Sequence, residues 1–196
     1  MGIETPERVD PAAFARRYDI PTPYVVYVGR VSPSKSCDVL LDHFVRYKAA
    51  HPGPLTLALV GRSEIAIPNR PDVVAVGFVS DEDKFSAIAG AELFLLPSRL
   101  ESLSMAFLES LALGTPVLCD GSSPVLSGHC RRSNAGLYYS NYPEFEAGLE
   151  LLLANPRLRR AMARRGRQYV QRHYTWEQVL QKYRRWIDAV AQEPWW

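Results

Sequence analysis

The feature that most constrains the fold is a series of short apolar segments, each flanked or terminated by a glycine or a proline. They are rich in β-branched and aromatic residues, which favours buried strands. The segments lie at residues 24–28, 55–60, 73–76, 91–96, 116–119 and 136–139. Because they are apolar on both faces, they predict a parallel sheet covered by helices on both sides.

Helical periodicity separates several of these strands, at residues 38–50, 81–89 and 104–113. From Pro143 onward no strand pattern occurs, and three further helices are expected at 144–154, 156–173 and 176–191. The alternation predicts an α/β fold, a Rossmann-like doubly wound parallel sheet of about six strands with a helical C-terminal tail. Residues 1–23 contain four prolines and are expected to be a linker segment that precedes one domain at 24–196.

Composition narrows the class of protein. A length of 196 residues with 47% hydrophobic residues allows a well-packed core. A net charge of only +2 gives no general attraction to nucleic acid, so none is expected as a partner. The three cysteines are widely spaced and form no C-x-x-C pair, which argues against a disulfide framework or zinc site and favours a reducing cytoplasm.

The most informative local pattern is the pair of carboxylates at Glu101 and Glu109. Glu101 follows Pro97-Ser98 at the carboxyl end of a predicted strand, where open α/β sheets bind their ligands. Backbone amides of residues 104–106 would open the next helix and face an anion. Glu109 lies further along this helix and can accept hydrogen bonds from ribose hydroxyls. This cleft has the groups needed to hold a nucleotide-diphosphate sugar.

Five ordered motifs carry a family resemblance: Val28-Gly29-Arg30 with Lys35, Val76-Gly77-Phe78-Val79, Leu96-Pro97-Ser98 with Glu101 and Glu109, Ala112 to Val117, and His173-Tyr174-Thr175-Trp176. In this order they resemble the C-terminal domain of retaining glycosyltransferases of the GT-B architecture, family 4 (glycosyl transferases group 1). The resemblance extends over roughly residues 20–190. A bare E-x7-E spacing occurs often by chance, so the order and the neighbours carry the signal.

The resemblance implies a role for each matching residue. Arg30 and Lys35 would grip the diphosphate and stabilise the departing nucleotide, and Glu101 would hold the donor sugar, which makes these three the candidate catalytic residues. The implied nucleotide-sugar-binding residues are Gly29, Phe78, Val79, Leu103, Ser104, Met105, Ala106 and Glu109. The donor would be a UDP- or GDP-type sugar, with no cofactor and no metal.

The sequence also departs from the family pattern. Leu103-Ser104 stands where the family usually has Phe-Gly, and only glycine lets a backbone approach a phosphate without a Cβ. This departure favours the alternative of a non-catalytic nucleotide-binding or regulatory domain. A second alternative is an unrelated doubly wound module, such as a flavodoxin-like receiver or a sugar-phosphate isomerase. A receiver would need an acidic cluster after its first strand, where Gly29-Arg30 stands instead.

Three other patterns have simple interpretations. Asp81-Glu82-Asp83 fits the D-x-D pattern but lies at the start of a predicted helix. Acidic residues there stabilise the helix through its dipole, so we expect no metal. Residues 122–127 are interpreted as a loop, with His129 after it as a minor candidate for ligand contact. Residues 157–167 contain six arginines and no acid. They are either a solvated helix face, which we favour, or a weak contact with a membrane surface.

The resemblance also implies missing partners. In the family an acceptor-side domain precedes this one, and Met1 to Glu4 resembles the piece that begins the second domain. We therefore expect a truncated form or one half of a split enzyme, which binds donor weakly and transfers little sugar alone. Its acceptor would be a sugar or a lipid-linked sugar, which fits a cytoplasmic protein at the periphery of the inner membrane face.

Overall fold

The computed structural model describes residues 1–192 and contains the predicted parallel sheet. The strands are β1 (Tyr24–Val28), β2 (Thr56–Val60), β3 (Val73–Gly77), β4 (Leu93–Leu96), β5 (Val117–Asp120) and β6 (Gly136–Tyr139). All pair in parallel in the order β3-β2-β1-β4-β5-β6. The sequence therefore predicted the strands and the fold class correctly. The largest boundary difference is at β4, which begins at Leu93 instead of residue 91.

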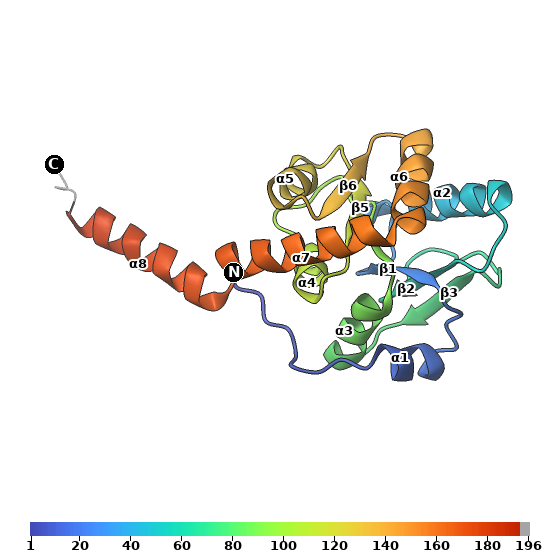
Figure 1. Ribbon diagram of the computed structural model, residues 1–196, viewed down its shortest axis with the longest axis horizontal. Helices are drawn as coiled ribbons and strands as arrows, with labels where there is room; N and C mark the ends of the chain where they lie inside the picture. Colours follow the sequence, from blue (N-terminus) through green and yellow to red (C-terminus); the bar gives the residue numbers. More distant parts are fainter. Residues whose placement is uncertain (193–196) are drawn as a thin grey trace.

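Helices cover both faces of this sheet (Figure 1). They are α1 (Pro11–Arg17), α2 (Cys37–Ala50), α3 (Asp81–Gly90), α4 (Met105–Leu113), α5 (Pro124–Ser133), α6 (Tyr142–Ala154), α7 (Pro156–His173) and α8 (Trp176–Gln192), with a 3-10 turn η1 at Pro33–Lys35. Helix α2 contacts α6, whereas α3 contacts α1 and α4. Right-handed crossovers on either side of β1 lead the chain to opposite halves of the sheet and place these helix groups on opposite faces.

Helix α5 corrects the sequence analysis, which interpreted residues 122–127 as a loop. Ser123 is its N-cap, and the Ser123 hydroxyl accepts a hydrogen bond from the Leu126 amide. Pro124 occupies the first turn, where its missing N–H costs nothing. Serine and proline are typical of loops, but in this order they also begin helices.

Residues 1–23 are packed against the domain. Ile3, Phe14 and Ile20 are buried in the main core. Arg17 of α1 donates two hydrogen bonds to Asp83 on α3, at 2.7 and 2.8 Å. The prolines of this segment predict a linker. Its spaced apolar side chains nevertheless pack into the core of the domain.

The last two helices differ in how they meet the body of the molecule. Helix α7 packs across α4, and α8 continues from it as an arm that leaves the body of the molecule (Figure 1). The N-terminus lies at their junction, where the Ile3 amide donates to the Tyr174 carbonyl at 2.7 Å. Within residues 1–192, no helix combines the length and the apolar character needed to cross a bilayer.

Candidate functional site

The candidate site lies at the carboxyl edge of the sheet, around the end of β1. Strand β1 pairs with β2 on one side and β4 on the other, because the chain builds one half of the sheet from β1 to β3 and then returns beside β1 as β4 to build the other half. Such a reversal opens a crevice at the carboxyl ends of the strands, where open α/β sheets bind ligands. Gly29 and Arg30 follow β1 at this point, and Pro97 and Ser98 follow β4.

Two cavities open at this crevice. The larger, of about 510 Å³, is lined by residues that follow β1, β2 and β3: Val28, Gly29, Arg30, Val60, Gly61, Arg62, Glu64, Phe78, Val79, Asp81 and Lys84. Phe78 is 90% exposed and offers a bare aromatic ring beside this cavity. An aromatic face of this kind suits a nucleobase, because every base can stack on it.

Glycine is required at one point in this wall. Gly61 has φ +138°, and a Cβ there would lie 2.0 Å from the Gly29 carbonyl oxygen. The amide of Gly29 in turn donates to the Val60 carbonyl at 2.9 Å. The loops after β1 and β2 can therefore touch only because no side chain separates them, and this contact shapes the larger cavity.

The smaller cavity, of about 180 Å³, adjoins the larger one at Val28 and Gly29. Its polar lining comes from η1, the end of β4 and the start of α4: Lys35, Ser98, Glu101 and Ser104. Lys35 Nζ lies 2.7 Å from Glu101 Oε1, and the Glu101 side chain is only 12% exposed. The structure thus joins the predicted phosphate-binding cation and the predicted sugar-binding carboxylate directly to each other.

Glu109 forms a second pair of this kind. It is buried on α4 and faces a hollow of about 620 Å³ that shares Asp81 and Lys84 with the larger cavity. Lys84 Nζ lies 3.1 Å from Glu109 Oε1. Lys84 is a site residue that the sequence does not indicate, because it follows three acidic residues whose charges are explained by the helix dipole.

The first turn of α4 carries local backbone strain. Ser104, its N-cap, has φ +64° and makes no side-chain cap hydrogen bond. Left-handed backbone is costly for a residue with a Cβ and natural for glycine. Met105 and Ala106 line the smaller cavity with Ser104, and their amides begin the helix. Amides of a helix N-terminus provide donors for an anion.

Leu103 lies outside the two cavities of the crevice. It lines a separate apolar hollow of about 340 Å³ at the base of α8, together with Tyr174, Val179, Tyr183 and Trp186 among others. Of the predicted binding residues, the structure therefore brings Gly29, Arg30, Phe78 and Val79 to one cavity and Lys35, Glu101, Ser104, Met105 and Ala106 to the next.

His129 lies beneath the loop that carries these groups. It is 2% exposed, its Nδ1 is 2.9 Å from the Tyr169 hydroxyl, and its ring hydrogen-bonds the Leu103 backbone. Burial, helped by the Arg132 charge, lowers the pKa of His129 to about 4, although the Leu103 backbone acts in the opposite direction. The imidazole is therefore neutral at physiological pH and supports the loop from behind.

The D-x-D pattern has a structural role. Ser80 caps α3, and its hydroxyl accepts from the Asp83 amide at 3.1 Å. Asp83 is buried and accepts from Arg17 and from the Tyr18 hydroxyl. Among the side chains that the structure describes, no group of three or more His, Cys, Asp or Glu is arranged to hold a metal ion.

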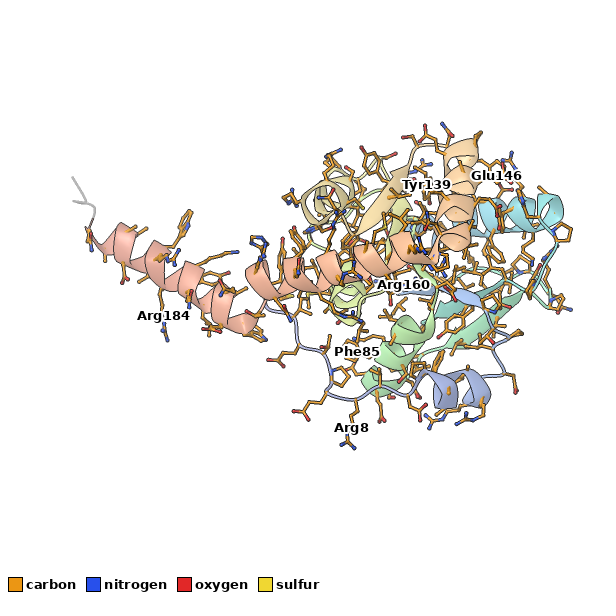
Figure 2. The ribbon with its side chains drawn as sticks, in the orientation of Figure 1. Arg8, Phe85, Tyr139, Glu146, Arg160 and Arg184 are labelled. Atoms are coloured by element: carbon orange, nitrogen blue, oxygen red, sulfur yellow. The ribbon has the colours of Figure 1, made fainter. Side chains whose placement is uncertain are left out.

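The arginine-rich face of α7 is solvent-exposed. Arg157, Arg160, Arg164 and Arg167 are exposed, and Arg167 donates to the Leu113 carbonyl at 2.7 Å. Figure 2 shows Arg184 projecting from α8, away from the sheet.

The fold and cleft define the class of protein, a Rossmann-like α/β domain with a polar crevice at the switch point of its sheet. A family model for glycosyl transferases group 1 matches residues 16–169, and the chain belongs to this family.

Curated relatives cover the same region. The chain is 27% identical over 169 residues to a GDP-mannose-dependent phosphatidylinositol monomannoside mannosyltransferase from Corynebacterium glutamicum, covering 80% of this chain and 44% of the relative. It is 26% identical over 200 residues to mannosylfructose-phosphate synthase from Agrobacterium fabrum, covering 91% and 43%. The chain therefore spans less than half the length of these relatives.

Solved structures share the fold. Sucrose-phosphate synthase from Thermosynechococcus elongatus has a TM-score of 0.70 at 25% identity, covering 92% of this chain and 50% of that one. Anabaena HepE in complex with UDP and glucose has a TM-score of 0.77 at 15% identity, covering 95% and 53%. The second likeness is one of fold alone.

Proposed function

We propose that this chain is the donor-binding half of a retaining glycosyltransferase that transfers a sugar from a nucleotide-diphosphate sugar to an acceptor. The observation that carries the proposal is the convergence, at one edge of the sheet, of a cation, two carboxylates with little exposed surface and a helix N-terminus. Lys35 and Glu101 meet at 2.7 Å, and Glu109 lies on the helix that Ser104 opens. Family membership supports the same assignment.

Each part of the cleft has a role in this proposal. The base stacks near Phe78 and Val79 in the larger cavity, and Glu109 accepts the ribose hydroxyls. Arg30, Lys35 and the amides at the start of α4 bind the diphosphate. Glu101 holds hydroxyls of the donor sugar, after Lys35 leaves it for a phosphate oxygen.

Catalysis in this scheme is electrostatic. Breaking the bond between sugar and diphosphate leaves new negative charge on the nucleotide. Fixed cations and helix amides aimed at that charge stabilise the transition state more than the ground state. The fork-shaped guanidinium of Arg30 and the compact ammonium of Lys35 suit two different phosphate oxygens. The proposed chemistry uses these groups and no metal or cofactor.

The donor is a GDP- or UDP-type sugar in this proposal, and we infer that GDP-mannose is the first to test. Two curated relatives at 27% and 28% identity are named GDP-mannose-dependent mannosyltransferases. The UDP complex of HepE makes UDP-glucose the natural second candidate.

The two carboxylates provide the test of this assignment. Glu109→Ala should weaken binding of plain GDP or UDP by about tenfold, the value of one lost hydrogen-bonded contact to a charged group. Glu101→Ala should not weaken binding of plain nucleotide, because it frees Lys35 for a phosphate oxygen, and should weaken binding of the sugar-bearing donor only. Isothermal titration calorimetry measures both. Equal losses of nucleotide affinity in the two variants would contradict the assigned roles.

We further propose an acceptor-side domain as the partner of α8, in the same chain or in another. One face of this helix exposes Leu180, Tyr183, Ile187 and Val190. The apolar hollow at its base includes Leu103, which adjoins the donor loop. A partner that covered both would close the donor cleft, and the relatives are more than twice as long as the matched region. The domain at 24–196 alone would then transfer sugar poorly, and robust transfer by the 196-residue chain would contradict this.

The arginine face of α7 is proposed as a weak contact with anionic headgroups, beside a sugar or lipid-linked acceptor. Its four exposed guanidinium groups have no acidic residue on the same helix. Cosedimentation with anionic vesicles at low and high salt tests this contact. A cytoplasmic location, peripheral to the inner membrane face, agrees with three free thiols. Nucleic acid is not a partner in this proposal.

The backbone at Ser104 favours a second candidate, a non-catalytic nucleotide-binding or regulatory domain. This residue has a Cβ and a positive φ where a phosphate would approach. Calorimetry with UDP and GDP separates the candidates at the first step. No binding at millimolar nucleotide would support loss of donor chemistry, whereas binding of a sugar nucleotide supports the transferase.

A further inference from the structure

Ser98 is the one buried side chain whose polar atom has no hydrogen-bond partner among residues 1–192. It follows β4 at the carboxyl edge of the sheet and is 0% exposed. A buried hydroxyl without a partner destabilises the folded protein, because its hydrogen bonds to water are not replaced by hydrogen bonds within the protein. Such a group in a native structure calls for an explanation.

The surroundings of Ser98 point to a ligand. The residue lines the smaller cavity, of about 180 Å³, together with Lys35, Glu101 and Ser104. Lys35 and Glu101 satisfy each other at 2.7 Å, so neither bonds to the serine. The hydroxyl therefore borders a cavity whose other polar groups are a cation, a carboxylate and the start of a helix.

We propose that Ser98 is a donor-binding residue whose hydroxyl bonds an oxygen of the sugar-diphosphate end of the nucleotide sugar. This inference rests on the proposed function and adds a contact to it. A hydroxyl can both donate and accept, so it suits a space where phosphate oxygens and sugar hydroxyls meet. The nucleoside end occupies the other cavity, whose lining does not include Ser98.

Ser110 offers a matched control. It is also 0% exposed, but its hydroxyl donates to the Phe107 carbonyl at 2.8 Å within α4. The two serines thus have equal burial and opposite hydrogen-bond states. Replacing each by alanine separates a hydroxyl held for a ligand from a hydroxyl held for the fold.

The experiment uses the 196-residue chain in three forms: wild type, Ser98→Ala and Ser110→Ala. Calorimetry measures binding of GDP-mannose and UDP-glucose, and of the monophosphates GMP and UMP. Ser98→Ala should lower the affinity for the sugar nucleotide by about tenfold and change the affinity for the monophosphate by less than about twofold. Its melting temperature should equal or exceed that of the wild type. Ser110→Ala should melt lower and bind all ligands as the wild type does.

Two results would overturn the assignment while leaving the proposed function intact. One is that the Ser98→Ala variant binds the sugar nucleotide as tightly as the wild-type chain does. The other is an equal loss for the monophosphate, which would place the contact at the nucleoside end. Absence of any binding by the wild-type chain at millimolar ligand would overturn both the proposed function and the role of Ser98.

Discussion

Two polar clusters adjoin the loop that precedes α4, and they differ in how their hydrogen-bonding groups are satisfied. In the first, called the rear cluster, His129, Tyr169, Tyr174 and Arg132 bond to one another and to the Leu103 backbone. In the second, called the front cluster, Lys35 and Glu101 form one charge pair, and Ser98 has no partner. The rear cluster is satisfied internally, whereas the front cluster leaves one buried hydroxyl without a hydrogen bond.

The largest expected effect is on stability, when acid protonates His129 in the rear cluster. Because burial lowers the pKa of His129 to about 4 from 6.5, the unfolded chain binds the proton more readily. This contribution to stability is present above pH 6.5 and is lost as the pH falls toward 4. Between pH 7.5 and 4 it should amount to about 3 kcal/mol, since one pKa unit corresponds to 1.36 kcal/mol.

The measurement is urea unfolding of the wild type and of His129→Gln across this pH range. The wild type should lose about 3 kcal/mol more stability than the variant, because other acid-sensitive groups are common to both. His173→Gln is the control, since His173 is exposed on the surface of α7. Parallel pH profiles for wild type and His129→Gln would show that the buried imidazole contributes nothing.

The next effect concerns the front cluster. Lys35→Ala should weaken binding of GDP or UDP by about tenfold to a hundredfold, the range for a lost charge-assisted bond. Arg160→Ala removes an exposed cation of α7 that lines neither cavity of the cleft, and should change affinity by less than about twofold. Calorimetry at two salt concentrations measures both variants. Equal effects would mean that the cleft attracts nucleotide only through general charge.

The smallest effect concerns the strained turn between the clusters. Ser104→Gly should stabilise the protein by about 1 kcal/mol, because φ +64° suits glycine and the serine side chain makes no cap bond. Ser102 is exposed and has no positive φ. Ser102→Gly should therefore destabilise the protein by about 0.5 kcal/mol, because glycine raises the conformational entropy of the unfolded chain. Thermal unfolding compares the two. Destabilisation by both would mean that Ser104 has a bond of its own in the folded protein.

The comparison of the clusters also shows what the sequence could predict. Strands, helices and the edge at which Glu101 and Glu109 lie follow from local periodicity and from short motifs, because parallel strands share one carboxyl edge. The ion-pair partners of these two carboxylates cannot be predicted from such local patterns. Lys84 reaches Glu109 across 25 positions, and Lys35 reaches Glu101 across 66. Such pairs depend on how α3, α4 and η1 pack, which no local pattern encodes.

The rear cluster was not predictable for a different reason. His129 lies on α5, whose first turn was interpreted as a loop, so its contacts with α7 could not be anticipated. Ser98 was recognised only as part of a motif, because the lack of a partner is a property of the folded surroundings. The sequence thus predicted the sheet edge at which these groups lie, and the packing shows how they are paired.

A crystal structure of the chain with GDP or UDP bound would test the proposed donor site most directly. We expect the diphosphate to lie between the loop after β1 and the first turn of α4, with Lys35 Nζ bonded to a phosphate oxygen and no longer to Glu101. A nucleotide bound elsewhere, with the 2.7 Å pair of Lys35 and Glu101 intact, would contradict it.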